Sequence, residues 1–198
     1  MEIVLATRNA DKVREIKAIL EGLCVKIVTF RELSKVPVVE EDGRTLEENA
    51  IKKASIWGRE TDKIALADDS GLEVDYLGGE PGVYSSRFAG ENVSYADNNA
   101  KLLRLLEGVE WERRTARFRC IAALVFPEGK RELFEGTVDG FITTRPRGEA
   151  GFGYDPVFFL PEYGKTFAEL GEEIKNKISH RAIAFGKLKR YFEKYRDT

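Results

Sequence analysis

The segment that says most about the fold of this 198-residue chain is Ile64-Ala65-Leu66-Ala67-Asp68-Asp69-Ser70-Gly71-Leu72. Its first four residues are apolar, which is typical of the end of a buried strand. Two adjacent carboxylates follow, and Ser70 with Gly71 then predicts a sharp turn. Because neighbouring side chains on an extended chain point to opposite faces, we expect Asp68 and Asp69 to differ, one facing a cleft and the other bracing the turn. Carboxylates at a strand end commonly hold Mg²⁺, although a simple turn pair explains this segment equally well.

Length and composition indicate one globular domain with room for two lobes. The chain is 42% hydrophobic and 33% charged, which is enough for a substantial core. Its 32 Lys and Arg residues against 34 Asp and Glu residues give a net charge of −2, which argues against a general polyanion binder such as a duplex-DNA protein. The two cysteines, Cys24 and Cys120, have no metal-binding spacing and predict a reducing compartment. Since no run reaches transmembrane length and the N-terminus enters a strand directly, we expect a soluble cytoplasmic protein.

The N-terminal segment has the pattern of a strand, a polar turn and a helix. Glu2 to Ala6 reads as a buried strand, and a helix is expected from about Asp11 to Glu21. The first N–H groups of such a helix are free and its dipole favours negative charge, so the turn predicts a phosphate site. An ordinary helix cap with exposed basic residues is the alternative. The turn reads Thr7-Arg8-Asn9-Ala10-Asp11-Lys12.

A second helix begins after Thr45, and its apolar stripe contains a lysine. Thr45 and Glu48 have the spacing of a capping box. Lys53 falls on the buried stripe, where it either snorkels to solvent or points into a cleft and holds a phosphate. The acidic loop before this helix offers a metal ligand, Glu40 or Glu41, or is simply solvated. The apolar positions of the stripe are Leu46, Ala50, Ala54 and Trp57.

The second half of the chain predicts a mixed sheet. Thr115 to Phe126 alternates as a strand, Pro127 to Lys130 reads as a hairpin turn, and Arg131 to Val138 is the expected return strand. A long hairpin added to an α/β pattern favours a mixed sheet over a doubly wound parallel one. Helices are expected from about Ser94 to Leu106 and after a capping Ser179.

The segment from Gly148 to Pro156 combines glycines with aromatic and acidic side chains. Glycine lets a ligand approach the backbone, and Phe152 or Tyr154 can stack on a planar base, although aromatic rings that fill the core explain the pattern as well. His180 is the only histidine in the chain. A helix N-terminus disfavours a cationic imidazole, so we expect a neutral hydrogen-bonding group at the edge of a base.

Taken together, these segments resemble the inosine triphosphate pyrophosphatase family, also called Ham1-like. The match extends from the first strand to the last helix, and the segments occur in the family's order. They are Thr7-x-Asn9-x-x-Lys12, Glu48-Asn49-Ala50-x-x-Lys53-Ala54, Ala67-Asp68-Asp69-Ser70-Gly71-Leu72, Pro81-Gly82-Val83-Tyr84-Ser85-Ser86-Arg87, Gly151-Phe152-Gly153-Tyr154-Asp155-Pro156 and Ser179-His180-Arg181.

This resemblance implies a fold and an activity. The fold would be a mixed twisted sheet with flanking helices, forming two lobes around a central cleft within one domain, residues 1–198. The activity would be Mg²⁺-dependent hydrolysis of ITP, dITP and XTP to the monophosphate and pyrophosphate, which cleanses the nucleotide pool. The resemblance also implies a homodimer whose partners are small nucleotides, and the composition predicts a cytoplasmic protein with no nucleic acid polymer and no membrane as partner.

The resemblance also implies roles for individual residues. Thr7 to Lys12 and Lys53 would hold the triphosphate. Asp69 would be the acid–base residue and a metal ligand with Glu40, and Ser70 would contact the substrate. Asp68 against Asp69, and Glu40 against Glu41, stay open as alternatives. The base pocket would comprise Phe152, Gly153, Tyr154, Asp155, Lys175, His180 and Arg181.

Two other functions fit parts of the pattern. An aspartate at a strand end is also typical of aspartyl phosphatases, but these normally have a second aspartate two residues later, where this chain has Ser70. A nucleotide sensor without catalytic activity would need the same binding residues. The reaction products separate these alternatives, because a phosphatase releases phosphate and a sensor releases nothing.

Overall fold

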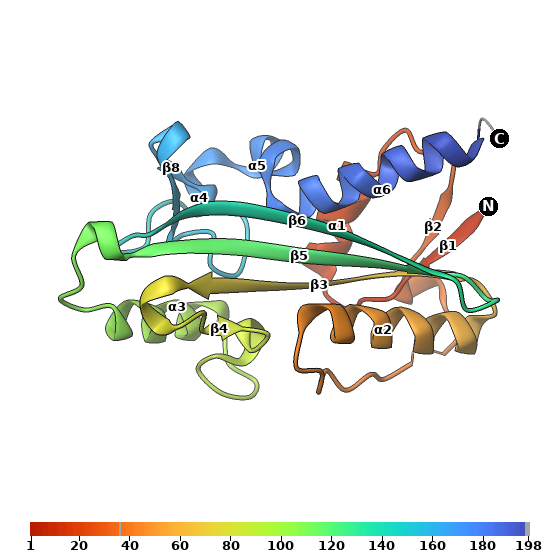
Figure 1. Cartoon of the computed structure of the whole chain (residues 1–198), viewed down its shortest axis with the longest axis horizontal. Helices are drawn as coiled ribbons and strands as arrows, with labels where there is room; N and C mark the ends of the chain where they lie inside the picture. The colour runs from red at the N-terminus through yellow and green to blue at the C-terminus, as the bar shows by residue number, and fades with distance from the viewer. Residues whose placement is uncertain (36, 197–198) are drawn as a thin grey trace. The chain divides into compact units, whose positions relative to one another are not determined.

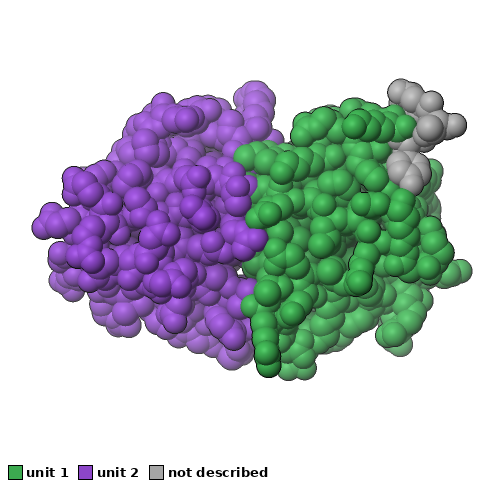
Figure 2. Space-filling view, in the orientation of Figure 1, with its two compact units in different colours: residues 1–69, 120–136, 180–198 green, residues 70–119, 137–179 purple. Residues whose placement is uncertain are grey.

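The computed structural model describes residues 1–35 and 37–196, with side chains as far as residue 194. The chain divides into two compact units (Figure 2). Unit 1 comprises residues 1–69, 120–136 and 180–198, and unit 2 comprises residues 70–119 and 137–179. Three strands contribute residues to both units: β3 (Ile64–Val74), β5 (Thr115–Val125) and β6 (Arg131–Ile142). The mixed α/β architecture expected from the sequence is therefore confirmed, and the central cleft stays a prediction.

Unit 1 contains the parallel part of the sheet. Its strand order is β2-β1-β3-β5-β6, and β1 pairs in parallel with both β2 and β3. Helix α2 lies on one side of β3, and α1 and α6 lie on the other (Figure 1). Two consecutive side chains on β3 therefore face different helices, one of them α2 and the other α1 and α6. The elements confined to this unit are β1 (Glu2–Leu5), α1 (Ala10–Ile19), β2 (Lys26–Val28), the 3₁₀ turn Phe30–Glu32, α2 (Leu46–Thr61) and α6 (His180–Arg196).

Unit 2 contains the antiparallel edge of the sheet and the shorter helices. Strand β7 pairs antiparallel with both β6 and β8, and β4 pairs antiparallel with the end of β3. The elements confined to this unit are β4 (Pro81–Gly82), α3 (Tyr95–Leu105), β7 (Phe158–Leu160), β8 (Lys165–Thr166), α4 (Phe167–Leu170), α5 (Glu172–Ile178) and the 3₁₀ turns Asp75–Leu77, Ser85–Arg87, Trp111–Arg113 and Pro161–Tyr163.

Each unit has its own hydrophobic core. The core of unit 1 joins the inner strands to α1 and α6, and that of unit 2 is rich in aromatic rings. Phe158 and Phe167 stack with their ring centroids 5.5 Å apart. In unit 1 the buried side chains include Ile3, Leu5, Ile16, Leu66, Cys120, Phe185 and Leu188, and in unit 2 they include Leu72, Leu102, Phe118, Ile142 and Val157.

The turn predicted at Ser70 and Gly71 was wrong. Strand β3 continues through both residues to Val74, so the paired carboxylates lie in the middle of a strand. Gly71 is required by space, because a Cβ atom there would lie 2.4 Å from the carbonyl oxygen of Gly82 on β4. The glycine signals close pairing of two strands, which in the sequence looks the same as a turn.

Several other boundaries differ from the prediction. Strand β6 extends four residues past Val138, the expected end of the return strand. The Glu48 carboxylate accepts the N–H of Arg44 at 2.6 Å, so the Thr45 cap forms only in part as a box. The hairpin turn is confirmed, since the N–H of Phe126 donates to the carbonyl of Lys130 at 2.8 Å.

Candidate active site

Asp68 is fully buried in β3 and faces α1 and α6 of unit 1. Its Oδ2 atom lies 2.9 Å from the Lys12 ammonium and 3.1 Å from Nη2 of Arg181. Burial alone would raise the pKa of Asp68, but Lys12, Arg181 and Lys53 outweigh it and lower that pKa. Asp68 is thus an ionised anchor for cations on two helices, and it does not brace a turn.

Arg181 is held between two carboxylates. Its Nη1 donates to Glu15 of α1 at 2.5 Å, while Nε and Nη2 meet Asp68 on β3. Burial alone would lower the pKa of Arg181, but Asp68 and Glu15 raise it. Glu15 was not among the residues predicted from the sequence. Its signal was the position three residues after Lys12, which places both on one face of the helix.

Asp69 faces the opposite helix, α2. Its Oδ1 atom accepts from Lys53 at 3.1 Å, and its Oδ2 atom accepts from the Asn49 amide at 3.2 Å. Burial raises the pKa of Asp69, and Glu41 adds to this, whereas Lys53 and Lys12 oppose it. A carboxylate with a raised pKa accepts a proton more readily, which is what a general base requires.

Lys53 points to carboxylates and away from solvent. Only 6% of the residue is exposed, and its ammonium lies 3.1 Å from both Asp69 and Glu41. Burial alone would lower the pKa of Lys53, but Asp69 and Glu41 raise it, so the side chain stays cationic. The snorkelling interpretation therefore does not describe this lysine.

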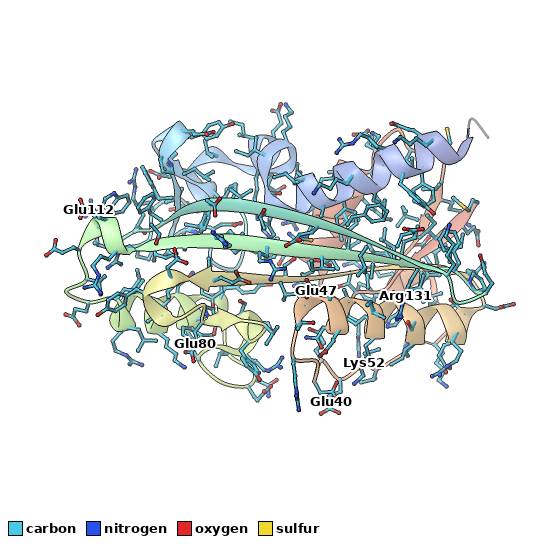
Figure 3. All side chains as sticks on the ribbon, viewed as in Figure 1. Glu40, Glu47, Lys52, Glu80, Glu112 and Arg131 are labelled. Carbon is cyan, nitrogen blue, oxygen red and sulfur yellow. The ribbon has the colours of Figure 1, made fainter. Side chains whose placement is uncertain are left out.

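Of the two candidate glutamates, Glu41 is the one that reaches this cluster. Burial alone would raise the pKa of Glu41, but Lys53 and Lys12 lower it. Glu40 is exposed (Figure 3). Within residues 1–35 and 37–196, no group of three or more His, Cys, Asp or Glu side chains is arranged to hold a metal ion. Asp69 and Glu41 nevertheless both lie against the Lys53 ammonium. Two carboxylates fit the needs of Mg²⁺, because that ion takes few carboxylates and completes its shell with water and phosphate.

The polar turn before α1 is partly closed by its own cap. Oδ1 of Asn9 accepts the N–H groups of Asp11 at 2.9 Å and Lys12 at 3.1 Å. The expectation that these first N–H groups are free is therefore wrong for both. Thr7 is buried and accepts the N–H of Asn9, while Arg8 is exposed. The side-chain charges of Arg8 and Lys12 can thus still attract an anion to this turn.

In unit 2 a buried ion pair supports the aromatic loop. The ammonium of Lys175 lies 2.5 Å from Asp155 and 4.4 Å from the centre of the Phe152 ring. Asp155 also accepts the N–H of Phe152 at 2.8 Å. Gly151 has φ +79°, and a Cβ atom there would collide with the Asp155 carboxylate. The loop therefore surrounds a cation with a carboxylate and a ring face.

The two aromatic residues of this loop differ in burial. The Tyr154 hydroxyl donates to the carbonyl of Ser85 at 2.9 Å, and its ring belongs to the core. Phe152 is half-buried and lies 5.9 Å from Tyr95. Phe152 is thus the ring better placed to stack on a planar ligand. Asn99, which was not predicted from the sequence, donates from its amide to the carbonyl of Gly153 at 3.0 Å.

The remaining predicted residues divide between the units. Ser70 is half-buried and follows Asp69 directly on β3, where the chain enters unit 2. Gly153 lies in the aromatic loop of unit 2 and has φ +64°. His180 is buried at the start of α6 in unit 1. Ala10 is exposed as the first residue of α1.

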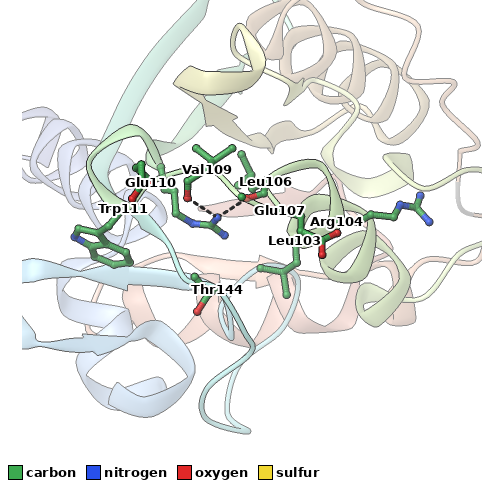
Figure 4. A pocket seen from close by; sticks show the side chains of 10 residues that line it. Leu103, Arg104, Leu106, Glu107, Val109, Glu110, Trp111 and Thr144 are labelled. Carbon is green, nitrogen blue, oxygen red and sulfur yellow. Dashed lines mark hydrogen bonds between the residues drawn. The ribbon is translucent and has the colours of Figure 1, made fainter.

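A separate cavity of about 590 Å³ lies in unit 2 beyond the end of α3, lined by Leu103, Glu107, Trp111 and Thr144 among others (Figure 4). Arg114 also lines it, and its guanidinium is buried. That guanidinium donates to four backbone carbonyl groups, those of Leu106, Val109, Ile142 and Thr143. Arg114 therefore ties the end of α3 to β6, and we assign this region a structural role.

The chain is similar to known proteins over nearly its whole length. The model of the Ham1 family matches residues 3–191. A dITP/XTP pyrophosphatase of Geobacter sulfurreducens is 56% identical over 187 residues, which covers 94% of each chain. One of Bacillus subtilis is 48% identical and covers 97% of each chain.

Solved structures agree with these sequence matches. A HAM1 protein from Coxiella burnetii has a TM-score of 0.90 at 41% identity and covers 98% of this chain and 99% of its own. The Ham1 protein of Staphylococcus aureus has a TM-score of 0.88 at 42% identity and covers 98% of this chain and 100% of its own. Among the described residues, no helix has the length and hydrophobicity needed to span a bilayer.

Proposed function

Because this chain belongs to the Ham1 family, we propose that it hydrolyses dITP, XTP and ITP to the monophosphate and pyrophosphate. The observation that carries this proposal is the Asp69 carboxylate, which is buried, has a raised pKa and lies against Lys53. A general base next to a cation is the arrangement that attack of water on a phosphoanhydride needs.

In the proposed reaction, water attacks the α-phosphorus and the bond to the β-phosphate breaks. Asp69 takes the proton of the attacking water, and negative charge develops on the leaving pyrophosphate. Lys53 and Lys12 neutralise that charge from α2 and α1 of unit 1. Asp69 and Glu41 would hold Mg²⁺, which supplies further neutralisation of phosphate charge when bound.

We propose Glu41 as the metal partner of Asp69 in preference to Glu40. Glu41 shares the Lys53 ammonium with Asp69, whereas Glu40 is exposed. A divalent cation placed near Lys53 would meet two carboxylates already directed at a positive charge.

We assign selection of the base to the aromatic loop of unit 2 with Lys175. His180 and Arg181, which were predicted to share this task, lie in unit 1, where Arg181 is bound to Asp68 and Glu15. Hypoxanthine and xanthine carry an acceptor oxygen at C6, where adenine carries an amine. Lys175, which is paired with Asp155, would donate a further hydrogen bond to that oxygen, and backbone N–H groups that bind it would be left unpaired by adenine. An unpaired buried polar group costs about 1–3 kcal/mol, so two such groups account for discrimination against ATP. Phe152 supplies the stacking surface.

We further propose that the protein works as a cytoplasmic homodimer on small nucleotides. The net charge of −2 does not favour a nucleic acid polymer as substrate. Size-exclusion chromatography with light scattering would test the dimer directly, since a molar mass equal to that of one 22.4 kDa chain contradicts it.

A product assay tests the proposed reaction. The protein is incubated with Mg²⁺ and, separately, with dITP, XTP, ITP, GTP or ATP, and the products are identified. Pyrophosphate from the first three substrates, with little turnover of GTP and ATP, is the expected result. Release of phosphate would instead indicate a phosphatase, and nucleotide binding without any product would indicate a sensor.

A further inference from the structure

Two side chains of α2 each link Asp69 to the acidic loop, residues 40–44, through hydrogen bonds at both ends. Asn49 and Lys53 lie one helical turn apart and are both buried. Lys53 joins Oδ1 of Asp69 to the carboxylate of Glu41. Asn49 joins Oδ2 of Asp69 to the backbone N–H of Gly43. The link through Lys53 is charged, and the link through Asn49 is neutral.

The link through Asn49 allows only one orientation of its amide. Oδ1 of Asn49 accepts the Gly43 N–H at 2.8 Å, so Nδ2 is the atom directed at Asp69, at 3.2 Å. A flipped amide would place an acceptor against the Asp69 carboxylate and a donor against the Gly43 N–H. The backbone of the loop thus determines that Asp69 receives a donor.

Gly43 permits this contact because it has no side chain. A Cβ atom at Gly43 would lie 2.5 Å from Oδ1 of Asn49 and 2.9 Å from Cβ of Glu48. The requirement is one of space, since the loop backbone approaches the amide closely. Any larger residue would displace either the loop or the Asn49 amide.

We propose that Asn49 is a positioning residue that fixes the plane of the Asp69 carboxylate, and that Gly43 holds Asn49 in place for this task. A carboxylate rotates easily about its last bond. The Asp69 carboxylate receives a hydrogen bond on each oxygen, from Lys53 on Oδ1 and from Asn49 on Oδ2, and these two bonds together define its plane. The proposal rests on the proposed role of Asp69 as the general base.

The first test replaces Asn49 with leucine, which keeps the volume and removes both hydrogen bonds. We expect kcat to fall by about 10- to 100-fold, because a small displacement of a reacting group has an effect of this order. KM for dITP should stay within about twofold, since the hydrogen bonds of Asn49 go to Gly43 and Asp69 and not to Lys12 or Lys53, the lysines proposed to meet the phosphates. Asn49→Ala serves the same purpose if the leucine variant does not fold.

Asn98 of α3 provides a matched control. It is equally buried, accepts the N–H of Ala89 at 2.7 Å and donates to the carbonyl of Ser86 at 3.2 Å. Asn98→Leu likewise removes one bond accepted from a backbone N–H and one bond donated to an oxygen, here a carbonyl rather than a carboxylate, and it does so within unit 2. It should lower the midpoint of thermal unfolding as much as Asn49→Leu does, and leave kcat within about twofold. Equal losses of kcat in the two variants would overturn the proposal.

A double-mutant cycle with Gly43→Ala tests the link to the loop. Gly43→Ala alone should lower kcat, and it should have little further effect in the Asn49→Leu background, because the link is already broken. Additive losses would show that Gly43 acts by another route and would overturn this part of the proposal. Wild-type turnover together with an inactive Asp69→Asn variant establishes the base independently. With both in hand, full kcat in Asn49→Leu rejects only the positioning role.

Discussion

At the scale of single residues, the two adjacent aspartates have different roles because their neighbours differ. Asp68 meets Lys12 and Arg181 and has a lowered pKa. Asp69 meets Lys53 and an uncharged amide from Asn49, and its pKa is raised. Strand geometry alone separates the two environments, since consecutive side chains point to opposite faces of the sheet.

The catalytic assignment predicts the behaviour of Asp69→Asn. The amide keeps the shape of the side chain but cannot accept the proton of water, so turnover of dITP should fall by about 100-fold or more. Binding of dITP, measured by isothermal titration in Ca²⁺ as a substitute for Mg²⁺, should persist. Full activity of this variant would contradict the role of Asp69.

The charge network around Asp68 predicts acid sensitivity. A carboxylate whose pKa is lowered by folding contributes stability above its unfolded pKa, near 4, and that contribution is lost as the pH falls towards the folded value. The free energy of unfolding, from urea titrations, should therefore decline below about pH 4. Asp68→Asn should be less stable by about 3–5 kcal/mol at pH 7, because Arg181 loses a buried partner, and should decline less steeply in acid. Parallel declines for both proteins would contradict this assignment.

At the scale of elements, helices carry the charged groups of the candidate site, and glycines allow neighbouring elements to approach closely. Strand β6 approaches the first turn of α6 so closely that a Cβ atom at Gly136 would collide with the carbonyl of His180 and lie 2.6 Å from the N atom of Ala184. This contact holds the start of α6, from which Arg181 reaches Asp68. The helix position therefore depends on the absence of a single methyl group.

Gly136→Ala should destabilise the protein by about 1–3 kcal/mol through overpacking and should also lower turnover by shifting Arg181. Gly186→Ala, within α6 itself, is the matched control, because its Cβ atom would meet only the end of Arg190 at 4.0 Å. That change should stabilise the protein by up to about 1 kcal/mol through helix propensity. Denaturant titrations of both variants measure their free energies of unfolding. Equal stability of the two variants would contradict the close contact between Gly136 and α6.

At the scale of the whole molecule, the residues that we propose for phosphate and base recognition fall into two units that each have a core. Unit 1 carries the cluster of Lys12, Lys53 and the aspartates, and unit 2 carries Phe152 with the Asp155–Lys175 pair. We infer that recognition of phosphate and recognition of the base are separable properties of this chain.

This division predicts contrasting binding defects. Lys53→Ala should weaken binding of inosine triphosphate by about tenfold or more and leave inosine unaffected, because only the triphosphate carries the charge that Lys53 meets. Phe152→Ala should weaken both ligands by a similar factor, since a stacked base contributes about 1–3 kcal/mol in either. Calorimetric titrations of both ligands check this. An equal loss for both ligands in Lys53→Ala would remove Lys53 from the phosphate site.

The sequence by itself determined the elements with strong local signals. Apolar periodicity located α1, α2, α3 and the long strands β3 and β5, and the ordered motifs identified the family. The sequence did not reveal β4, β8, α4 or α5, because elements of two to seven residues are stabilised by tertiary contacts rather than by local preference. The turn predicted at Gly71 was wrong for the same reason, since the glycine is required by the pairing of β3 with β4, which is a tertiary contact.

Only the tertiary structure shows which charged groups meet within the candidate site, and the roles that we propose rest on those contacts. Local sequence named Asp68, Asp69, Glu40, Glu41 and Lys53 but did not rank them. The ranking follows from which charges meet across unit 1: Asp68 meets Arg181, 113 residues away, while Asp69 meets Lys53 and, through it, Glu41. Burial and the nearest charges set the ionisation of a carboxylate, and both are properties of the folded chain that no local pattern contains.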